Sequence, residues 1–175
     1  MGSNWDRLIV FTEFSAYFYD QASNKKVFDI GCSNNRTIKN FSSYLIWANK
    51  DNVWVSTGGQ PQATGNDILE LIHNSSCSNW RAEMIDGEYH FYLGATEANG
   101  LAYTNCLATL NIQTGMWRWR ELYDNVKSMA KYTSDGDDYL YMGMSDGMVM
   151  VKSKWTDTTP LFADDGNPID RKSVV

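Results

Sequence analysis

Tyr139-Leu140-Tyr141-Met142-Gly143 and Gly147-Met148-Val149-Met150-Val151 are two short apolar runs joined by a polar turn. Aromatic and β-branched residues are enriched in strands, and two such runs with a short turn between them predict a β-hairpin. A pair of this kind recurs along the chain at a spacing of very roughly 40 residues. The other pairs lie at 7–11 with 15–20, 43–47 with 52–55, and 88–94 with 106–112.

Hairpins that repeat at such a period are typical of propellers and arrays, in which no unit buries its own hydrophobic face alone. We therefore predict an all-β fold: a propeller-like array of about four short antiparallel blades within one domain, 1–175, with an incomplete ring as one option. A third strand is expected at 26–30, after a polar turn at 20–25. Asp86-Gly87 is a hairpin signal, and a polar loop is expected over 95–104.

One short helix is predicted over 66–73. Asn66 is suited to the N-cap position, and the carboxylate of Asp67 in the first turn would interact favourably with the helix dipole. Asn74-Ser75-Ser76 then ends the helix.

The chain starts and stops within the strand pattern, at 7–11 and at 173–175. A propeller closes on itself to remove the edges of its sheets. We therefore expect a fragment of a longer protein, one subunit of a closing assembly, or an open arc that neighbours cover.

Composition narrows the class of protein. The 175 residues are 43% hydrophobic with a formal net charge of −6, so we expect a globular protein without the basic patch of a non-specific nucleic-acid binder. The three cysteines, Cys32, Cys77 and Cys106, are odd in number and widely spaced, which favours reduced, partly buried thiols and folding in a cytoplasm. No apolar run has the length of a membrane span, and no signal peptide is visible.

Two acidic turns are candidate cation sites, because calcium prefers several oxygen ligands. Asp135, Asp137 and Asp138 flank Gly136, and a similar group occurs at 164–167. Neither group has a twelve-residue calcium loop with a distal Glu. We therefore interpret both as structural turns.

Catalytic patterns are weak. The turns at 134–136 and 145–147 resemble the Ser-x-Asp-x-Gly-x-x-Trp turn of sialidase propellers but lack its Trp, and nothing pairs two carboxylates across a cleft. His73 and His90 have no partners at zinc-binding spacing, and Gly58-Gly59 does not precede a helix as a phosphate loop would. We predict no catalytic residues, no cofactor and no metal.

Trp117 and Trp119 alternate with Arg118 and Arg120. In a strand this spacing places both Trp on one face and both Arg on the other. The Trp pair could fill space between blades, or it could form a stacking platform for a carbohydrate with a basic stripe behind it. Packing is the favoured interpretation, because propeller cores are commonly aromatic.

Several stretches together resemble the β-propeller virion proteins of tailed bacteriophages, a broad family of tail nozzle, tubular tail and head-to-tail connector components. The stretches are Asp6–Glu13 with Ser15–Tyr17, Ile30–Cys32 with Arg36–Ile38, Asn105–Trp119, Tyr141–Gly147 and Asp164–Ile169. The resemblance spans nearly the whole chain, although members of the family are usually longer, with more blades on the N-terminal side.

This resemblance implies a structural virion protein without enzymatic activity, assembled in the cytoplasm of the bacterial host. Its partners would be other virion proteins and copies of itself in a homo-oligomeric ring around the DNA exit path. Double-stranded DNA would pass without specific binding. A carbohydrate-binding or receptor-recognising propeller is the alternative, and a glycosidase comes third; either should gather aromatic and carboxylate side chains at one end of the blades.

Overall fold

The structure is a computed structural model that describes residues 8–20, 23–134, 136–152, 163–164 and 167–168. Its strands are β1 (Leu8–Phe11), β2 (Ala16–Asp20), β3 (Ser23–Phe28), β4 (Lys39–Phe41), β5 (Tyr44–Ala48), β6 (Val53–Ser56), β7 (Gln62–Ala63), β8 (Arg81–Ile85), β9 (Glu88–Ala98), β10 (Leu101–Asn111), β11 (Trp117–Glu121), β12 (Val126–Ser134), β13 (Asp137–Met144), β14 (Val149–Lys152), β15 (Ala163–Asp164) and β16 (Asn167–Pro168). The α-helix α1 (Leu69–Asn74) and the 3₁₀ turns η1 (Asn35–Thr37), η2 (Asn66–Ile68) and η3 (Cys77–Asn79) lie between them.

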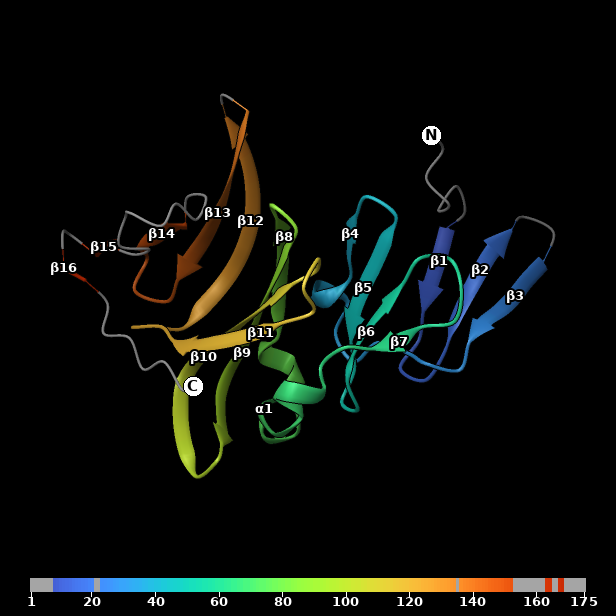
Figure 1. The fold of residues 1–175 in the computed structure, drawn as a ribbon, viewed down its shortest axis with the longest axis horizontal. Coiled ribbons are helices and arrows are strands. Elements are labelled where there is room, and N and C mark those ends of the chain that lie inside the picture. Colours follow the sequence, from blue (N-terminus) through green and yellow to red (C-terminus); the bar gives the residue numbers. More distant parts are fainter. Residues whose placement is uncertain (1–7, 21–22, 135, 153–162, 165–166, 169–175) are drawn as a thin grey trace.

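The strands form antiparallel meanders that follow the chain order. Sheet 1 contains β1–β3, sheet 2 contains β4–β7, sheet 3 contains β8–β11 and sheet 4 contains β12–β14, and β15 pairs with β16. The four sheets stand side by side in a row, in the order of the sequence (Figure 1). The prediction of an all-β array of blades with one short helix is confirmed.

Sheets 1 and 2 pack face to face through aromatic side chains. Trp47 of β5 is fully buried, and its ring contacts Phe11 of β1 and Phe28 of β3 at centroid distances of 5.1 and 5.9 Å. The indole Nε1 of Trp47 donates a hydrogen bond to the carbonyl oxygen of Gly31 at 3.1 Å. One tryptophan therefore joins the two sheets by both its ring and its polar atom.

Sheets 2 and 3 enclose the largest hydrophobic core, which also includes the helix. Ile46 and Val53 of sheet 2 meet Phe91 of sheet 3, and Leu71 and Ile72 of α1 pack on the same core. Sheets 3 and 4 share a smaller core, whose members are Ile85, Tyr92, Leu107, Leu122, Val126, Leu140, Met142 and Met144. Each core thus lies between two consecutive sheets.

The interior sheets are apolar on both faces for this reason. In β5, Leu45 and Trp47 point into the core shared with sheet 1, whereas Ile46 and Ala48 point into the core shared with sheet 3. Successive strand residues face opposite sides, and a strand covered on both sides reads as a continuous apolar run. The sequence from Tyr44 to Ala48 is such a run.

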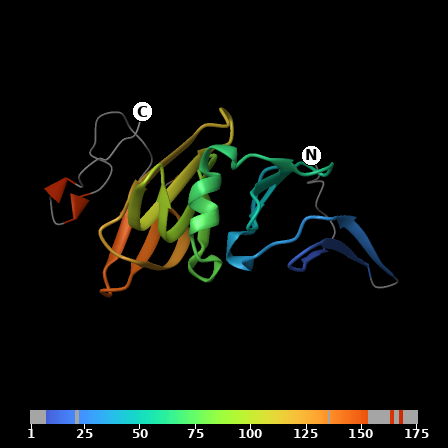
Figure 2. The ribbon, with the colours of Figure 1, turned by 90° about the horizontal axis from the view of Figure 1, so that it is seen from below.

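The first strands of sheets 2, 3 and 4 lie beside one another. β8 contacts both β4 and β12. The last strands of sheets 2 and 3, β7 and β11, occupy the opposite edges of their sheets. The view turned by 90° again shows the sheets as successive layers (Figure 2). Sheets 2, 3 and 4 therefore share one side that is formed by their first strands.

The predicted loop at 95–104 is wrong. β9 and β10 continue through this segment and are joined by Asn99-Gly100, both at positive φ (52° and 72°). The extension is held because its buried residues face the helix, and the hydroxyl of Thr96 donates to the carbonyl of Leu71 at 2.6 Å. Tertiary packing has overridden the polar composition of the segment. Two short strands, β4 and β7, were also missed, and β3 begins three residues before the expected position, within the predicted turn.

The helix is confirmed, but its predicted cap is wrong. Gly65, not Asn66, occupies the N-cap position of the 3₁₀ turn that leads into α1. As a glycine it provides no side-chain capping hydrogen bond. The side chain of Asn52 replaces that function, since its Oδ1 accepts from the N–H of Gly65 at 2.7 Å and its Nδ2 donates to Asn66 Oδ1 at 3.0 Å. The helix ends at Asn74, with His73 exposed in its last turn.

All three cysteines are free thiols, as expected. Cys32 and Cys77 are half-buried and Cys106 is fully buried on β10. Burial raises the pKa of the Cys106 thiol to about 12, and the nearby Glu121 carboxylate adds to the effect. The folded state therefore favours the protonated form of this side chain.

We expect Cys106 to make the protein less stable at alkaline pH. The folded state binds the thiol proton more tightly than the unfolded state does. The resulting contribution to the free energy of unfolding is fully present below the ordinary thiol pKa of about 8.5 and is lost as pH rises toward about 12. Within that window the free energy of unfolding should fall by about 1.4 kcal/mol per pH unit because of this group. Denaturant unfolding of the wild type and Cys106→Ala across the window should show a slope shallower by that amount in the variant.

Tyr89 and Tyr92 also have pKa values raised by burial, but they contribute equally to both proteins, so the difference in slope isolates Cys106. Met116→Ala, which changes an exposed side chain that does not titrate, is the control and should keep the wild-type slope. Equal slopes for the wild type and Cys106→Ala would contradict the assignment.

Candidate assembly surfaces

Sheet 1 carries apolar side chains on the face that points away from sheet 2. Leu8, Val10 and Tyr19 are 62%, 43% and 50% exposed. Leu8 stands opposite Tyr19, and Val10 stands opposite Tyr17, in the β1–β2 register. Since directly opposed residues of an antiparallel pair share a face, these side chains form one patch, the sheet 1 face.

Sheet 4 has a corresponding patch on the face that points away from sheet 3. Val149 and Val151 are 59% and 43% exposed, and Tyr141 lies between Val151 and Ala130 in the register. Tyr132, also exposed, contacts the Tyr141 ring edge-on at a centroid distance of 5.8 Å. We call this patch, Tyr132, Tyr139, Tyr141, Val149 and Val151, the sheet 4 face.

Both terminal sheets thus have the composition of a sheet covered on two sides. In β1 the inward residues Ile9 and Phe11 alternate with the outward residues Leu8 and Val10, and all four are apolar. A half-exposed antiparallel strand would normally alternate apolar with polar residues. Exposed contiguous apolar patches mark interaction sites. The sequence shows that these strands are apolar at successive positions. It does not show which face of each sheet is left exposed.

The Asp-rich turn connects β12 with β13, as the turn interpretation predicted. Gly136 has φ of +86°, a conformation that favours glycine. Asp138 accepts from the hydroxyl of Thr133 at 2.6 Å and forms an ion pair with Lys131 at 2.5 Å, so its charge is compensated locally. Asp135 lies outside the described residues.

The second acidic turn falls between β15 and β16, whose register pairs Ala163 with Pro168 and Asp164 with Asn167. Asp165 and Gly166 lie outside the described residues. In the part of the chain that the structure describes, no group of three or more His, Cys, Asp or Glu side chains is placed to hold a metal ion.

The turn at Ser145-Asp146-Gly147 is held by a carboxylate that the sequence analysis missed. Asp124 accepts from the hydroxyl of Ser145 at 2.6 Å and from the N–H of Asp146 at 2.9 Å. The hydrogen bond from Ser145 lowers the pKa of Asp124, and other hydrogen bonds add to this. Asp146 in turn accepts from the N–H of Met148. These carboxylates organise the β13–β14 hairpin.

His90 is fully buried in the middle of sheet 3. Its Nδ1 lies 3.1 Å from the hydroxyl of Thr109, and its Nε2 lies 3.5 Å from Glu88, which also pairs with Arg118 at 2.5 Å. A hydroxyl, an imidazole and a carboxylate in this order are the groups of a nucleophilic triad. Here, however, the imidazole has no exposed surface and Thr109 is 5% exposed, so a substrate would have to displace the sheet to reach them.

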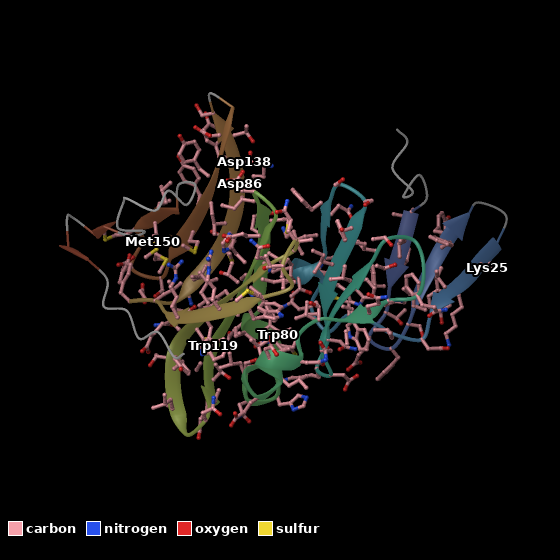
Figure 3. All side chains as sticks on the ribbon, in the orientation of Figure 1. Lys25, Trp80, Asp86, Trp119, Asp138 and Met150 are labelled. Atoms are coloured by element: carbon pink, nitrogen blue, oxygen red, sulfur yellow. The ribbon has the colours of Figure 1, made fainter. Side chains whose placement is uncertain are left out.

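The alternation of Trp and Arg in β11 is confirmed. Trp117 and Trp119 stand opposite Leu110 and Ala108, which belong to the core shared with sheet 2, and the two arginines point to the other face. Trp117 is 9% exposed and its Nε1 donates to the carbonyl of Thr64 at 2.5 Å. Trp119 is only half-buried, and its indole Nε1 donates to the hydroxyl oxygen of Tyr103 at 3.3 Å. Trp119 lies on the same part of the array as Trp80 (Figure 3).

No model of a known protein family matches this chain, and no curated protein sequence matches it. Among the described residues, no helix has both the length and the apolar run that crossing a bilayer requires.

We expect Trp117→Ala to destabilise the protein by roughly 3–5 kcal/mol, because it removes a large buried aromatic side chain. Trp119→Ala should cost clearly less, since part of that ring is already in contact with water. Denaturant unfolding followed by circular dichroism measures both. Met116→Ala, at a neighbouring residue that is 69% exposed, is the control and should change the free energy of unfolding by less than about 0.5 kcal/mol. A stable Trp117→Ala variant would refute the packing role.

Proposed function

We propose that this protein is a structural component of a tailed-phage virion, of the tail nozzle, tail tube or head-to-tail connector type, and that it acts by assembly and not by catalysis. Copies join head to tail into a ring around the DNA exit path, with other virion proteins as neighbours. The observation that carries the proposal is the pair of apolar faces on sheets 1 and 4, at opposite ends of one array. The resemblance of the turn and strand motifs to phage propeller proteins supports the virion context.

The internal packing of the chain supplies the model for the contact between copies. Along the array, each sheet packs one of its faces against the next sheet in the chain through aliphatic and aromatic side chains. The sheet 4 face of one copy and the sheet 1 face of the next would continue this series. Fully burying a Val or Leu side chain stabilises by roughly 1.5–3 kcal/mol, so several such residues can offset the loss of freedom on association.

The proposed contact between copies would lead to a ring and not to a closed dimer. The two faces differ in sequence and lie at opposite ends, so a contact between them is heterologous. Heterologous contacts produce rings when the rotation closes. A contact of the sheet 1 face with itself would instead produce a closed dimer and would leave both sheet 4 faces bare.

We expect the wild-type protein to have a native mass of several copies, and Leu8→Lys or Val151→Lys to abolish the assembly because each places a charge in one face. An equimolar mixture of the two variants should form dimers, since each retains the face that the other has lost. Native mass spectrometry measures these masses, and negative-stain micrographs of the wild type should show rings. Met116→Lys, which changes an exposed residue outside both faces, should assemble normally.

Two results would contradict the proposal. If Val151→Lys alone formed dimers, the sheet 1 face would pair with itself. If the wild type remained a monomer and bound a sugar on a glycan array, the carbohydrate-binding alternative would replace assembly.

A further inference from the structure

Three cations gather where sheets 2, 3 and 4 meet, on the side formed by the first strands. Arg36 belongs to η1, Arg81 is the first residue of β8, and Lys127 is the second residue of β12. We call this set the cationic junction. Arg36 and Lys127 are exposed and Arg81 is half-buried.

Hydrogen bonds fix the three segments against one another. Asn34, which caps η1, donates from Nδ2 to the carbonyls of Cys77 at 2.7 Å and of Trp80 at 3.2 Å. The guanidinium of Arg81 donates from Nε to the carbonyl of Lys127 at 3.2 Å. The three segments that carry these cations therefore have defined positions relative to one another.

Arg81 is held so that part of its guanidinium stays available. Its Nη1 donates to the carbonyls of Ser78 and Trp80, at 3.0 and 2.7 Å. With Nε also engaged, the N–H groups on Nη2 have no partner among the described residues. All of these acceptors are neutral carbonyls, and Arg81 has no ion pair with a carboxylate of the described residues.

Several cations elsewhere in the described chain are paired with carboxylates. Lys39 pairs with Glu83, the only carboxylate on β8, and further ion pairs join Lys26 with Asp29, Arg118 with Glu88 and Lys131 with Asp138. The chain has 21 acidic against 15 basic residues, so carboxylates are not scarce. At the cationic junction, burial and then the positive charge of Arg36 lower the pKa of Arg81.

We propose that the cationic junction binds the phosphate backbone of double-stranded DNA. This inference rests on the proposed function, which places the protein beside passing DNA. Guanidinium groups match phosphate oxygens in geometry, and a contact to the backbone reads no sequence. The acidic remainder of the surface would limit adhesion to this one site, so that DNA is guided without being retained.

The test uses a short fluorescein-labelled duplex DNA and the full chain, with affinity measured by fluorescence anisotropy over a series of salt concentrations. Arg36→Gln and Lys127→Gln should each weaken binding, and the double variant more so. The slope of log K against log salt should fall by about 0.9 for each lost phosphate contact. Arg81→Lys keeps the positive charge but removes the planar guanidinium, which can donate two N–H groups to one phosphate, so this variant should also bind DNA more weakly.

Lys25→Gln is the matched control, since Lys25 is an exposed lysine on sheet 1, at the far end of the array from Trp80 and the cationic junction (Figure 3). It should bind DNA as the wild type does. Thermal melting of every variant confirms folding. Absence of binding at low salt, a wild-type slope in the double variant, or an equal loss in Lys25→Gln would each overturn the inference.

The native masses of the same variants separate the two proposals. If the double variant assembles and keeps full DNA affinity, the inference is wrong and the assembly proposal stands. If the wild type does not assemble, the proposed function is wrong whatever the DNA result.

Discussion

Packing of one sheet face against the next is the interaction on which this structure depends. A β-sheet with an apolar face must bury that face against another element of the fold. Here Trp47 fills the space between sheets 1 and 2, Phe91 lies in the core between sheets 2 and 3, and Tyr92 lies in the core between sheets 3 and 4. Tyr92 and Phe91 are neighbours in β9, so one strand supplies both sides of its sheet.

Hydrogen bonds give this packing its direction. The hydroxyl of Tyr89 on sheet 3 donates to the carbonyl of Thr37 at 2.7 Å, and the hydroxyl of Thr37 accepts from the N–H of Ala48 on sheet 2. Burial raises the pKa of Tyr89 well above its ordinary value, because the ionised phenol would lose water without gaining a cation. Apolar surfaces alone allow several arrangements, whereas a buried donor must meet its acceptor. These bonds therefore select one orientation of sheet 3 on sheet 2.

The same physics explains why the ends of the array and the cationic junction are the functional candidates. Interior sheets satisfy both faces within the chain, but sheets 1 and 4 each satisfy one and carry apolar residues on the other. Elsewhere, Lys26, Lys39, Arg118 and Lys131 have carboxylate partners, whereas Arg81 of the cationic junction donates only to carbonyls among the described residues. In both places the described part of the molecule contains a group whose preferred partner is missing from it.

The sequence by itself determined the strands and many of their turns. Alternation and turn chemistry are local properties, so Asp86-Gly87, with φ of 49° and 77°, was a hairpin signal that needed no tertiary information. That Trp117 and Trp119 share one face of their strand also followed from the sequence, because side chains two residues apart in a strand point to the same face. The helix also followed from its local apolar spacing, although its cap did not, because Asn52 acts from thirteen residues away in the chain.

The tertiary structure decided what the sequence could not. The segment 95–104 is a strand pair because α1 packs against it, and Gly31 is required because a Cβ there would lie 2.1 Å from the carbonyl oxygen of Glu13. Which apolar face is bare and which cations meet also depend on the order of the sheets in space. Arg36, Arg81 and Lys127 are far apart in the chain and come together only because consecutive sheets place their first strands side by side. Local patterns specify elements, but contacts between distant segments specify the surfaces that those elements build.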